Sequence, residues 1–160
     1  MSQYMTAKLI ISAIANKIGK DSVTESIENE KDPKSVIIRI NPNKIKETAE
    51  FLKSQDFEYL SFITAVDLKK HIDMVYWFTS QKLGFHACIK CTLPPVNPEI
   101  ESLCGVYATA NWNEREAYDM FGVKFTGHPE LKRILTWDEF VGHPLLKKYK
   151  VIDDPDVPMK

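Results

Sequence analysis

The sequence predicts an α+β fold. We expect a two-layer domain in the order helix, strand, strand, helix, three strands, helix, with a mostly antiparallel sheet and an extended C-terminal tail. Two segments repeat their apolar residues at helical spacing, and five short segments rich in β-branched and aromatic residues are separated by turn-forming residues. The residues after Gly122 show no sustained period. This grouping of elements is typical of helices covering one face of a sheet.

The first predicted helix covers residues 3–18, where apolar residues recur three to four positions apart, and Gly19 is its expected cap. Two strands are expected next, over residues 22–28 and 35–40, with Lys-Asp-Pro between them as a turn. Pro42 is expected to open a second amphipathic helix, whose inner side carries Ile45, Ala49, Phe51 and Leu52.

Three β-rich segments follow, over residues 59–68, 72–80 and 84–93. The connections between them, Lys-Lys-His and Gln-Lys-Leu-Gly, read as hairpin turns. After the proline-rich stretch at residues 94–99 we expect a short helix over residues 99–103. A longer helix is predicted over residues 111–122, with Asn111 as its N-cap and Gly122 in the left-handed position that follows a helix.

The faces of this last helix can be assigned at about 100° per residue. Its core face is predicted to carry Ala117, Tyr118, Met120 and Phe121. Its outer face carries Trp112, Arg115, Glu116 and Asp119, and the spacing of four lets Arg115 pair with Asp119. Glu114 projects among the apolar residues, so we expect it to need the Asn111 amide and a cation, either Arg133 or His128. A capped, salt-bridged surface helix and a functional site are equally compatible with this pattern.

The tail contains one motif twice, Gly-His-Pro-x-Leu-Lys from Gly127 and again from Gly142. Proline holds the preceding histidine in extended geometry, and two histidines fall short of a metal shell. We interpret each unit as an anchor in which the leucine is buried, the imidazole is hydrogen-bonded and lysine or arginine lies at the rim. The tail has too many apolar residues for a solvated segment. We therefore divide the chain into an α+β domain, residues 1–122, and an extended partner-binding tail, residues 123–160.

Composition excludes several classes of protein. The net charge of −1 does not favour a nucleic-acid binder, and acidic residues dilute the lysines between residues 132 and 150. No segment approaches the roughly 20 apolar residues of a membrane span. The N-terminus does not resemble a signal peptide, and three cysteines, an odd number, favour a reducing cytoplasm over a disulfide scaffold.

Cys88 and Cys91 have the spacing of half a zinc site or of a redox pair. Residues three apart in a strand point to opposite faces, and no helix N-terminus is expected beside them, so we interpret both as structural thiols. The remote alternative is a stand-alone metalloenzyme that uses His86, Cys88, Cys91 and His128. No nucleophile, phosphate loop or metal triad accompanies the acidic residues of the last helix, so no independent catalytic site is expected.

The segment NWNEREAYDMFGVKFTGHPELKRIL closely resembles the signature of the thirty-kilodalton subunit (the C subunit) family of respiratory NADH:quinone oxidoreductases. The match includes Glu-Arg-Glu, an acidic residue three positions later, a His-Pro pair, and a basic residue before an aliphatic pair. GHPLLKKY resembles the family's next Gly-His-Pro-Leu stretch. After this second Gly-His-Pro-Leu the chain departs from the family pattern, with Leu146 to Lys150 in place of Arg-Lys-Asp-Tyr-Pro. Short relatives of the family occur in archaeal reduced-deazaflavin dehydrogenases and in membrane-bound hydrogenases.

The resemblance implies a non-catalytic peripheral-arm subunit with no prosthetic group and no metal of its own. Its implied partners are a hydrogenase-like large subunit, of the forty-nine-kilodalton type, and iron–sulfur subunits, which would hold the iron–sulfur clusters and the flavin or deazaflavin. The membrane would be reached only through these partners, on the cytoplasmic side. The electron donor stays open. The residues implied at the partner interface are Glu114, Arg115, Glu116, Asp119, His128, Pro129, Lys132, Arg133, Gly142, His143 and Pro144.

Overall fold

The computed structural model describes residues 7–28 and 32–150. The predicted helical residues 3–6, Lys31 of the predicted turn, and residues 151–160 of the predicted tail lie outside this part of the chain. The helices are α1 Ala7–Ile18, α2 Ile45–Ser54 and α3 Ala110–Phe121, with 3₁₀ turns at Lys20–Ser22 and Pro42–Lys44. The strands are β1 Val23–Glu28, β2 Ser35–Ile40, β3 Tyr59–Asp67, β4 Ile72–Ser80, β5 Phe85–Leu93, β6 Glu99–Glu101 and β7 Lys124–Thr126. None of the described helices has the length and apolar character that crossing a membrane requires.

Five strands form one sheet in the order β1-β2-β5-β4-β3. Every neighbouring pair is antiparallel except β2 and β5, which are parallel. The predicted α+β class and the mostly antiparallel sheet are therefore confirmed. The parallel pair arises because the chain returns through α2, β3 and β4 before β5 joins β2 in the middle of the sheet.

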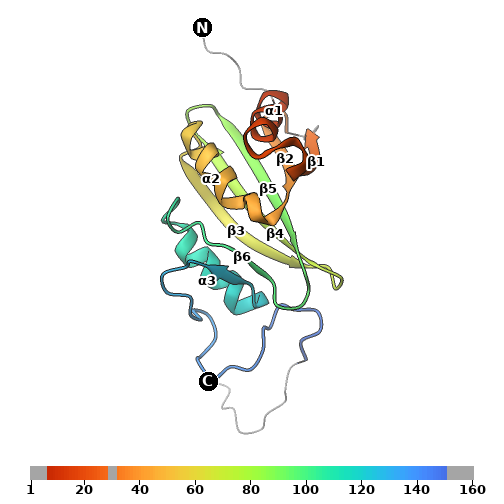
Figure 1. Cartoon of the computed structure of the whole chain (residues 1–160). Helices are drawn as coiled ribbons and strands as arrows, with labels where there is room; N and C mark the ends of the chain where they lie inside the picture. The colour runs from red at the N-terminus through yellow and green to blue at the C-terminus, as the bar shows by residue number, and fades with distance from the viewer. Residues whose placement is uncertain (1–6, 29–31, 151–160) are drawn as a thin grey trace.

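Alternating burial defines the inner face of this sheet. Met74, Tyr76 and Phe78 of β4 are fully buried, whereas the intervening residues of that strand are only partly covered. Helices α1 and α2 pack on the sheet at the upper end of the molecule, and α3 packs against β3 at the lower end (Figure 1). The tail passes along α3 on the side away from α1 (Figure 1).

The region between β5 and α3 differs from the prediction. Residues 99–103 do not form a helix; Glu99–Glu101 is strand β6, which pairs in parallel with β7. Two three-residue strands are too short to show a period, so the sequence pattern could not distinguish them from a helical turn. Val123 and Phe125 are buried in the core, so the folded domain continues beyond Gly122 into the first residues of the segment that we separated as the tail.

Candidate functional site

Helix α3 carries four of the predicted motif residues, and three of these four are buried. Glu114, Arg115 and Asp119 are all inaccessible or nearly so, although the helical period predicts Arg115 and Asp119 on the outer face. That face is covered by the tail. The N-cap position belongs to Thr109 and not to Asn111. Gly122 follows the helix in the left-handed conformation with φ 74°, as predicted, and its N–H donates to the Tyr118 carbonyl oxygen.

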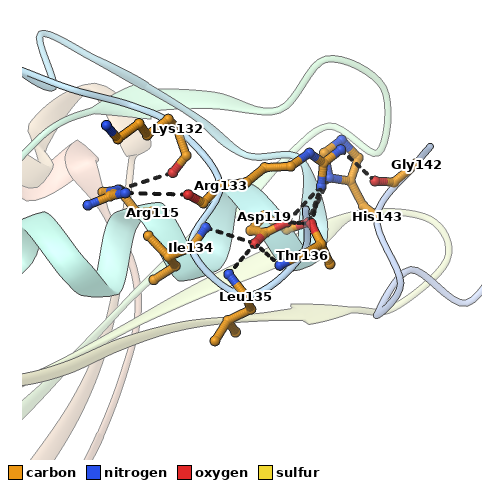
Figure 2. A network of polar contacts seen from close by, with 9 residues as sticks. All are labelled: Arg115, Asp119, Lys132, Arg133, Ile134, Leu135, Thr136, Gly142 and His143. Carbon is orange, nitrogen blue, oxygen red and sulfur yellow. Dashed lines mark hydrogen bonds and ion pairs between the residues drawn. The ribbon is translucent and has the colours of Figure 1, made fainter. Parts of the chain in front are cut away.

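Asp119 holds the first part of the tail (Figure 2). Its Oδ2 accepts hydrogen bonds from the backbone N–H groups of Ile134, Leu135 and Thr136 at 3.1, 2.8 and 2.9 Å. Its Oδ1 accepts from the Thr136 hydroxyl and from Arg133 Nη1, the latter at 2.7 Å. Burial alone would raise the pKa of Asp119, but these donors outweigh it and hold that pKa well below the ordinary value of 3.8. Asp119 is therefore an ionised, fully hydrogen-bonded anchor.

Arg133 joins this anchor to the second Gly-His-Pro unit. Besides Asp119, its guanidinium donates to the Gly142 carbonyl oxygen at 2.9 Å and lies 5.7 Å from the centre of the Phe140 ring. The predicted pair of Arg115 and Asp119 is wrong. Arg115 instead donates to the carbonyl oxygens of residues 132 and 133 (Figure 2) and lies 5.0 Å from the centre of the Trp112 ring. Both arginines thus bind tail backbone.

The two repeated histidines bind the backbone of the same helix. His128 Nε2 lies 3.2 Å from the Asn111 carbonyl oxygen, and His143 Nδ1 lies 2.9 Å from the Asp119 carbonyl oxygen. Leu131 and Leu146 are partly buried against the core, and the basic residues after them, except the partly buried Arg133, are exposed. Each repeat thus has the hydrogen-bonded imidazole that we predicted, whereas its leucine, predicted to be buried, is only partly covered. The covered surface is the chain's own helix.

Glu114 is buried and held by different groups from those predicted. Its oxygens accept from the Ser102 hydroxyl and the Leu103 N–H, each at 2.6 Å, and the Cys104 thiol lies 3.5 Å away. Burial raises the pKa of Glu114 above 4.5, and these hydrogen bonds offset only part of that increase. The Asn111 amide and Arg133 are not among its described partners, whereas His128, the other predicted cation, lies near enough to favour the ionised form of Glu114. Ser102 and Thr136 were missed because a hydroxyl in an irregular segment gives no periodic signal.

The structure argues against the alternative metal or redox site at Cys88 and Cys91. Cys88 and Cys91 are both buried in β5, at positions three apart that face opposite sides of the sheet. Burial raises the pKa of each thiol, which opposes thiolate formation. Neither cysteine, nor His86, belongs to a group of potential metal ligands within residues 7–28 and 32–150. His86 Nδ1 instead lies 3.1 Å from the Thr79 hydroxyl.

The remaining motif residues lie at the surface of the site. Glu116, Pro129, Lys132 and Gly142 are exposed and Pro144 is partly buried, and Lys132 pairs with Glu130 at 2.6 Å. Large apolar side chains also remain exposed on α3 and the tail: Trp112, Leu135, Trp137, Val141 and Leu145. Four of them lie on the anchored tail and Trp112 lies on α3, so this region exposes large apolar side chains to its surroundings. We call these five side chains the apolar surface of the tail.

Comparisons with known proteins agree on one family. Residues 38–155 match the sequence pattern described as the respiratory-chain NADH dehydrogenase 30 kDa subunit. The C subunit of the NADH-quinone oxidoreductase of Neorickettsia sennetsu is 38% identical over 120 residues, which are 73% of this chain and 64% of that relative. This chain thus spans less than two thirds of that relative's length. The C subunit of the F(420)H(2) dehydrogenase of Methanosarcina mazei is 35% identical over 150 residues, which are 91% of this chain and 93% of that relative.

Two solved structures are also similar. The trypsin-resistant fragment (1–134) of Nqo5 has the same fold, with a TM-score of 0.65 at 22% identity over 76% of this chain and 99% of that one. A chain of the membrane-bound sulfane sulfur reductase, an archaeal respiratory membrane complex, gives a TM-score of 0.70 at 26% identity. That match covers 82% of this chain and 77% of the other.

Proposed function

The chain belongs to the family of the respiratory-chain NADH dehydrogenase 30 kDa subunit, and from this premise we propose that it is a non-catalytic scaffold subunit of a membrane-bound oxidoreductase. The complex couples electron transfer to proton or ion translocation. Helix α3 and the tail bind the hydrogenase-like large subunit, of the forty-nine-kilodalton type, near the electron-acceptor site. The iron–sulfur clusters and the flavin or deazaflavin lie in partner subunits, through which this chain reaches the cytoplasmic side of the membrane.

The observation that carries this proposal is the apolar surface of the tail. Leu135 is 63% exposed and Val141 is 70% exposed, yet the backbone beneath them is fixed to α3 by Asp119 and Arg133. An ordered, exposed apolar surface is typical of a protein–protein interface. Because the loop is ordered before binding, little conformational entropy is lost when a partner covers it.

The polar residues of the motif support a structural role over a catalytic one. Both carboxylate oxygens of Asp119 are occupied by donors, and the Arg133 guanidinium contacts Asp119, Thr136 and Gly142. A general base needs a lone pair within reach of a substrate. Side chains committed in this way determine the shape of the tail.

A second candidate is the equivalent subunit of an archaeal reduced-deazaflavin dehydrogenase or a membrane-bound hydrogenase. It is favoured by the match to the Methanosarcina mazei protein, which includes 91% of this chain against 73% for the Neorickettsia sennetsu protein. Both candidates assign the same scaffold role to this chain. They differ in the electron donor, which a partner subunit would bind.

Gentle affinity purification from native membranes tests the proposal. We expect a hydrogenase-like large subunit and iron–sulfur subunits to co-purify, and the donor-binding subunit to distinguish the two candidates. The double substitution Leu135→Ser with Val141→Ser should abolish co-purification without changing the thermal stability of the isolated chain. Leu9→Ser is the matched control, because Leu9 is 50% exposed on α1, at the other end of the molecule (Figure 1). Unchanged recovery of partners with the double variant would refute the assigned surface.

A further inference from the structure

Three potential metal ligands of different chemistry meet beside the first turn of α3. Cys104 comes from the loop after β6, Glu114 from α3 and His128 from the first Gly-His-Pro unit. One ligand atom from each lies within 4.8 Å of the other two. These residues are ten and fourteen positions apart in the sequence, so no local spacing marked them as a set.

Glu114 is the buried carboxyl group of this cluster, and in its ionised form it needs a compensating positive charge. Glu114 is completely buried, and within the described ranges no ion pair at 4.0 Å or less includes it, although His128 lies near enough to favour its ionised form. Buried charges in proteins are generally paired with an opposite charge or coordinate a metal ion. Its hydrogen-bond donors, Ser102, Leu103 and Cys104, are all neutral groups.

We propose that Cys104, Glu114 and His128 bind a zinc ion, with water in the fourth position. Thiolate, carboxylate and imidazole are the ligands that Zn²⁺ takes in proteins, in tetrahedral geometry. The distance between Cys104 Sγ and Glu114 Oε2 is 3.5 Å. A tetrahedral ion with Zn–S of about 2.3 Å and Zn–O of about 2.0 Å places these two atoms about 3.5 Å apart.

Binding exchanges the thiol proton for the metal. The sulfur–hydrogen bond of Cys104 breaks, the sulfur binds zinc as a thiolate, and the proton is released to water. Glu114 binds as the carboxylate, and any proton on it is likewise released to water, so that two anionic ligands balance the charge of the ion. Because the thiol must lose its proton to bind the metal, zinc affinity should increase as the pH rises.

The histidine is already oriented by the backbone. His128 Nδ1 accepts from the Glu130 N–H at 3.0 Å, which places the ring proton on Nε2 facing the Asn111 carbonyl oxygen. Zinc binding to one ring nitrogen of His128 would replace the hydrogen bond that this nitrogen makes. Zinc-binding histidines commonly donate their other ring N–H to a carbonyl oxygen, and the exposed Glu130 amide can turn to water. The ion would fasten the tail to the β6–α3 loop and to α3 at one point.

Metal analysis and cobalt spectroscopy of the tag-free chain test the site. We expect stoichiometric zinc after equilibration with micromolar zinc and dialysis, and a higher melting temperature with zinc than with chelator. Cobalt should give the visible bands of a tetrahedral ion and a thiolate-to-cobalt charge-transfer band. Cys104→Ser should remove the charge-transfer band. It should also weaken zinc binding by at least about 100-fold, because loss of a residue that only supports a ligand already costs up to about 100-fold in metal affinity.

Cys88→Ser is the matched control, because it removes a buried thiol of β5 outside the cluster and should leave the cobalt spectrum unchanged. His128→Gln provides an independent arm if Cys104→Ser does not fold, and it should also weaken zinc binding. No stoichiometric zinc in the folded wild-type chain would overturn the proposal. So would a cobalt spectrum that persists in Cys104→Ser or lacks the thiolate band. Neither result bears on the scaffold role, which co-purification tests separately.

Discussion

Asp119→Asn removes one charge from the centre of the anchored tail and leaves its shape almost unchanged. In the wild type, the Asp119 carboxylate accepts three backbone N–H groups and the Arg133 guanidinium. The asparagine amide keeps only one oxygen, and its NH₂ group would face donors. We expect the tail around residues 133–136 to open far more often, while the sheet stays folded.

The magnitude follows from the buried ion pair. Removing one partner of a buried pair costs about 3–5 kcal/mol, because the other charge is left uncompensated. The side chain of Arg133 is 14% exposed and that of Asp119 is 0% exposed, so water can partly solvate the guanidinium and the lower end of the range applies. A cost of about 3 kcal/mol corresponds to roughly a 100-fold change in the opening equilibrium.

Amide hydrogen exchange measures this opening directly. The amides of Ile134, Leu135 and Thr136, which donate to Asp119 Oδ2, should lose about 100-fold protection. Buried amides of β4 and β5 should not change. Because the folded pKa of Asp119 lies below its unfolded value near 3.8, its contribution is present above that pH and is lost as the pH falls further.

Lys132→Met is the control for this experiment. The ammonium group of Lys132 contacts Glu130 at the surface, where both side chains are more than half exposed. Such a pair contributes at most about 1 kcal/mol, so exchange at the three tail amides should be nearly unchanged. Equal protection of these amides in wild type and Asp119→Asn would refute the anchoring role of Asp119.

Three further predictions concern the same region. Gly122→Ala should lower the free energy of unfolding by about 2–3 kcal/mol in urea titrations, because the backbone φ is 74° and the new Cβ would lie 2.6 Å from the His143 ring. Gly84→Ala is the control: its φ is 60° but its Cβ would meet open space, so it should cost only about 1 kcal/mol. Glu114→Gln, compared with wild type in chelator at pH 7, should change stability by less than about 1.5 kcal/mol, since the amide can still accept one backbone N–H and donate to a hydroxyl. The wild type should lose stability as the pH rises from 4.5 through the raised folded pKa of Glu114, and the variant should lack this dependence in pH-resolved unfolding. Arg133→Ala should reduce the amount of assembled complex on native gels before it reduces turnover per assembled particle.

A specific result would contradict each of these three predictions. Equal costs for the two glycine substitutions would exclude the contact with His143 as the cause. A Glu114→Gln variant as unstable as Asp119→Asn would show that the buried carboxylate is required in its ionised form. Normal assembly with abolished turnover in Arg133→Ala would indicate a direct part in electron or proton transfer.

The long elements of the fold were predictable because their burial repeats with a regular period. The strands over residues 59–93 show this clearly, and Gly122 marked the end of α3 because a left-handed residue favours glycine. Strand β6 was not predictable. Its three residues pair with β7, which lies more than twenty positions later, and such a pairing leaves no local pattern.

The sequence identified some members of the site, but it missed Ser102 and Thr136 and predicted only part of the contacts. The repeats identified His128 and His143 as anchors, and both bind α3. Helical periodicity placed Arg115 and Asp119 outward because it considers one helix alone. Their partners are mainly backbone groups of the tail, and backbone donors and acceptors occur at almost every residue. Sequence cannot select among them without the path of the chain.

The spacing of the two histidine contacts determines how far the segment between them must bulge. The accepting carbonyl groups, at residues 111 and 119, are about 12 Å apart along a helix that rises about 1.5 Å per residue. The fifteen residues from His128 to His143 could extend to about 50 Å. Residues 132–136 are held on α3 by Arg115 and Asp119, so the surplus length lies mainly in residues 137–142, which must project away from the helix. Insertions or deletions between Thr136 and Gly142 would therefore change the reach of this projection without releasing the Asp119 or His143 contacts, which allows one scaffold to fit partners of different shape.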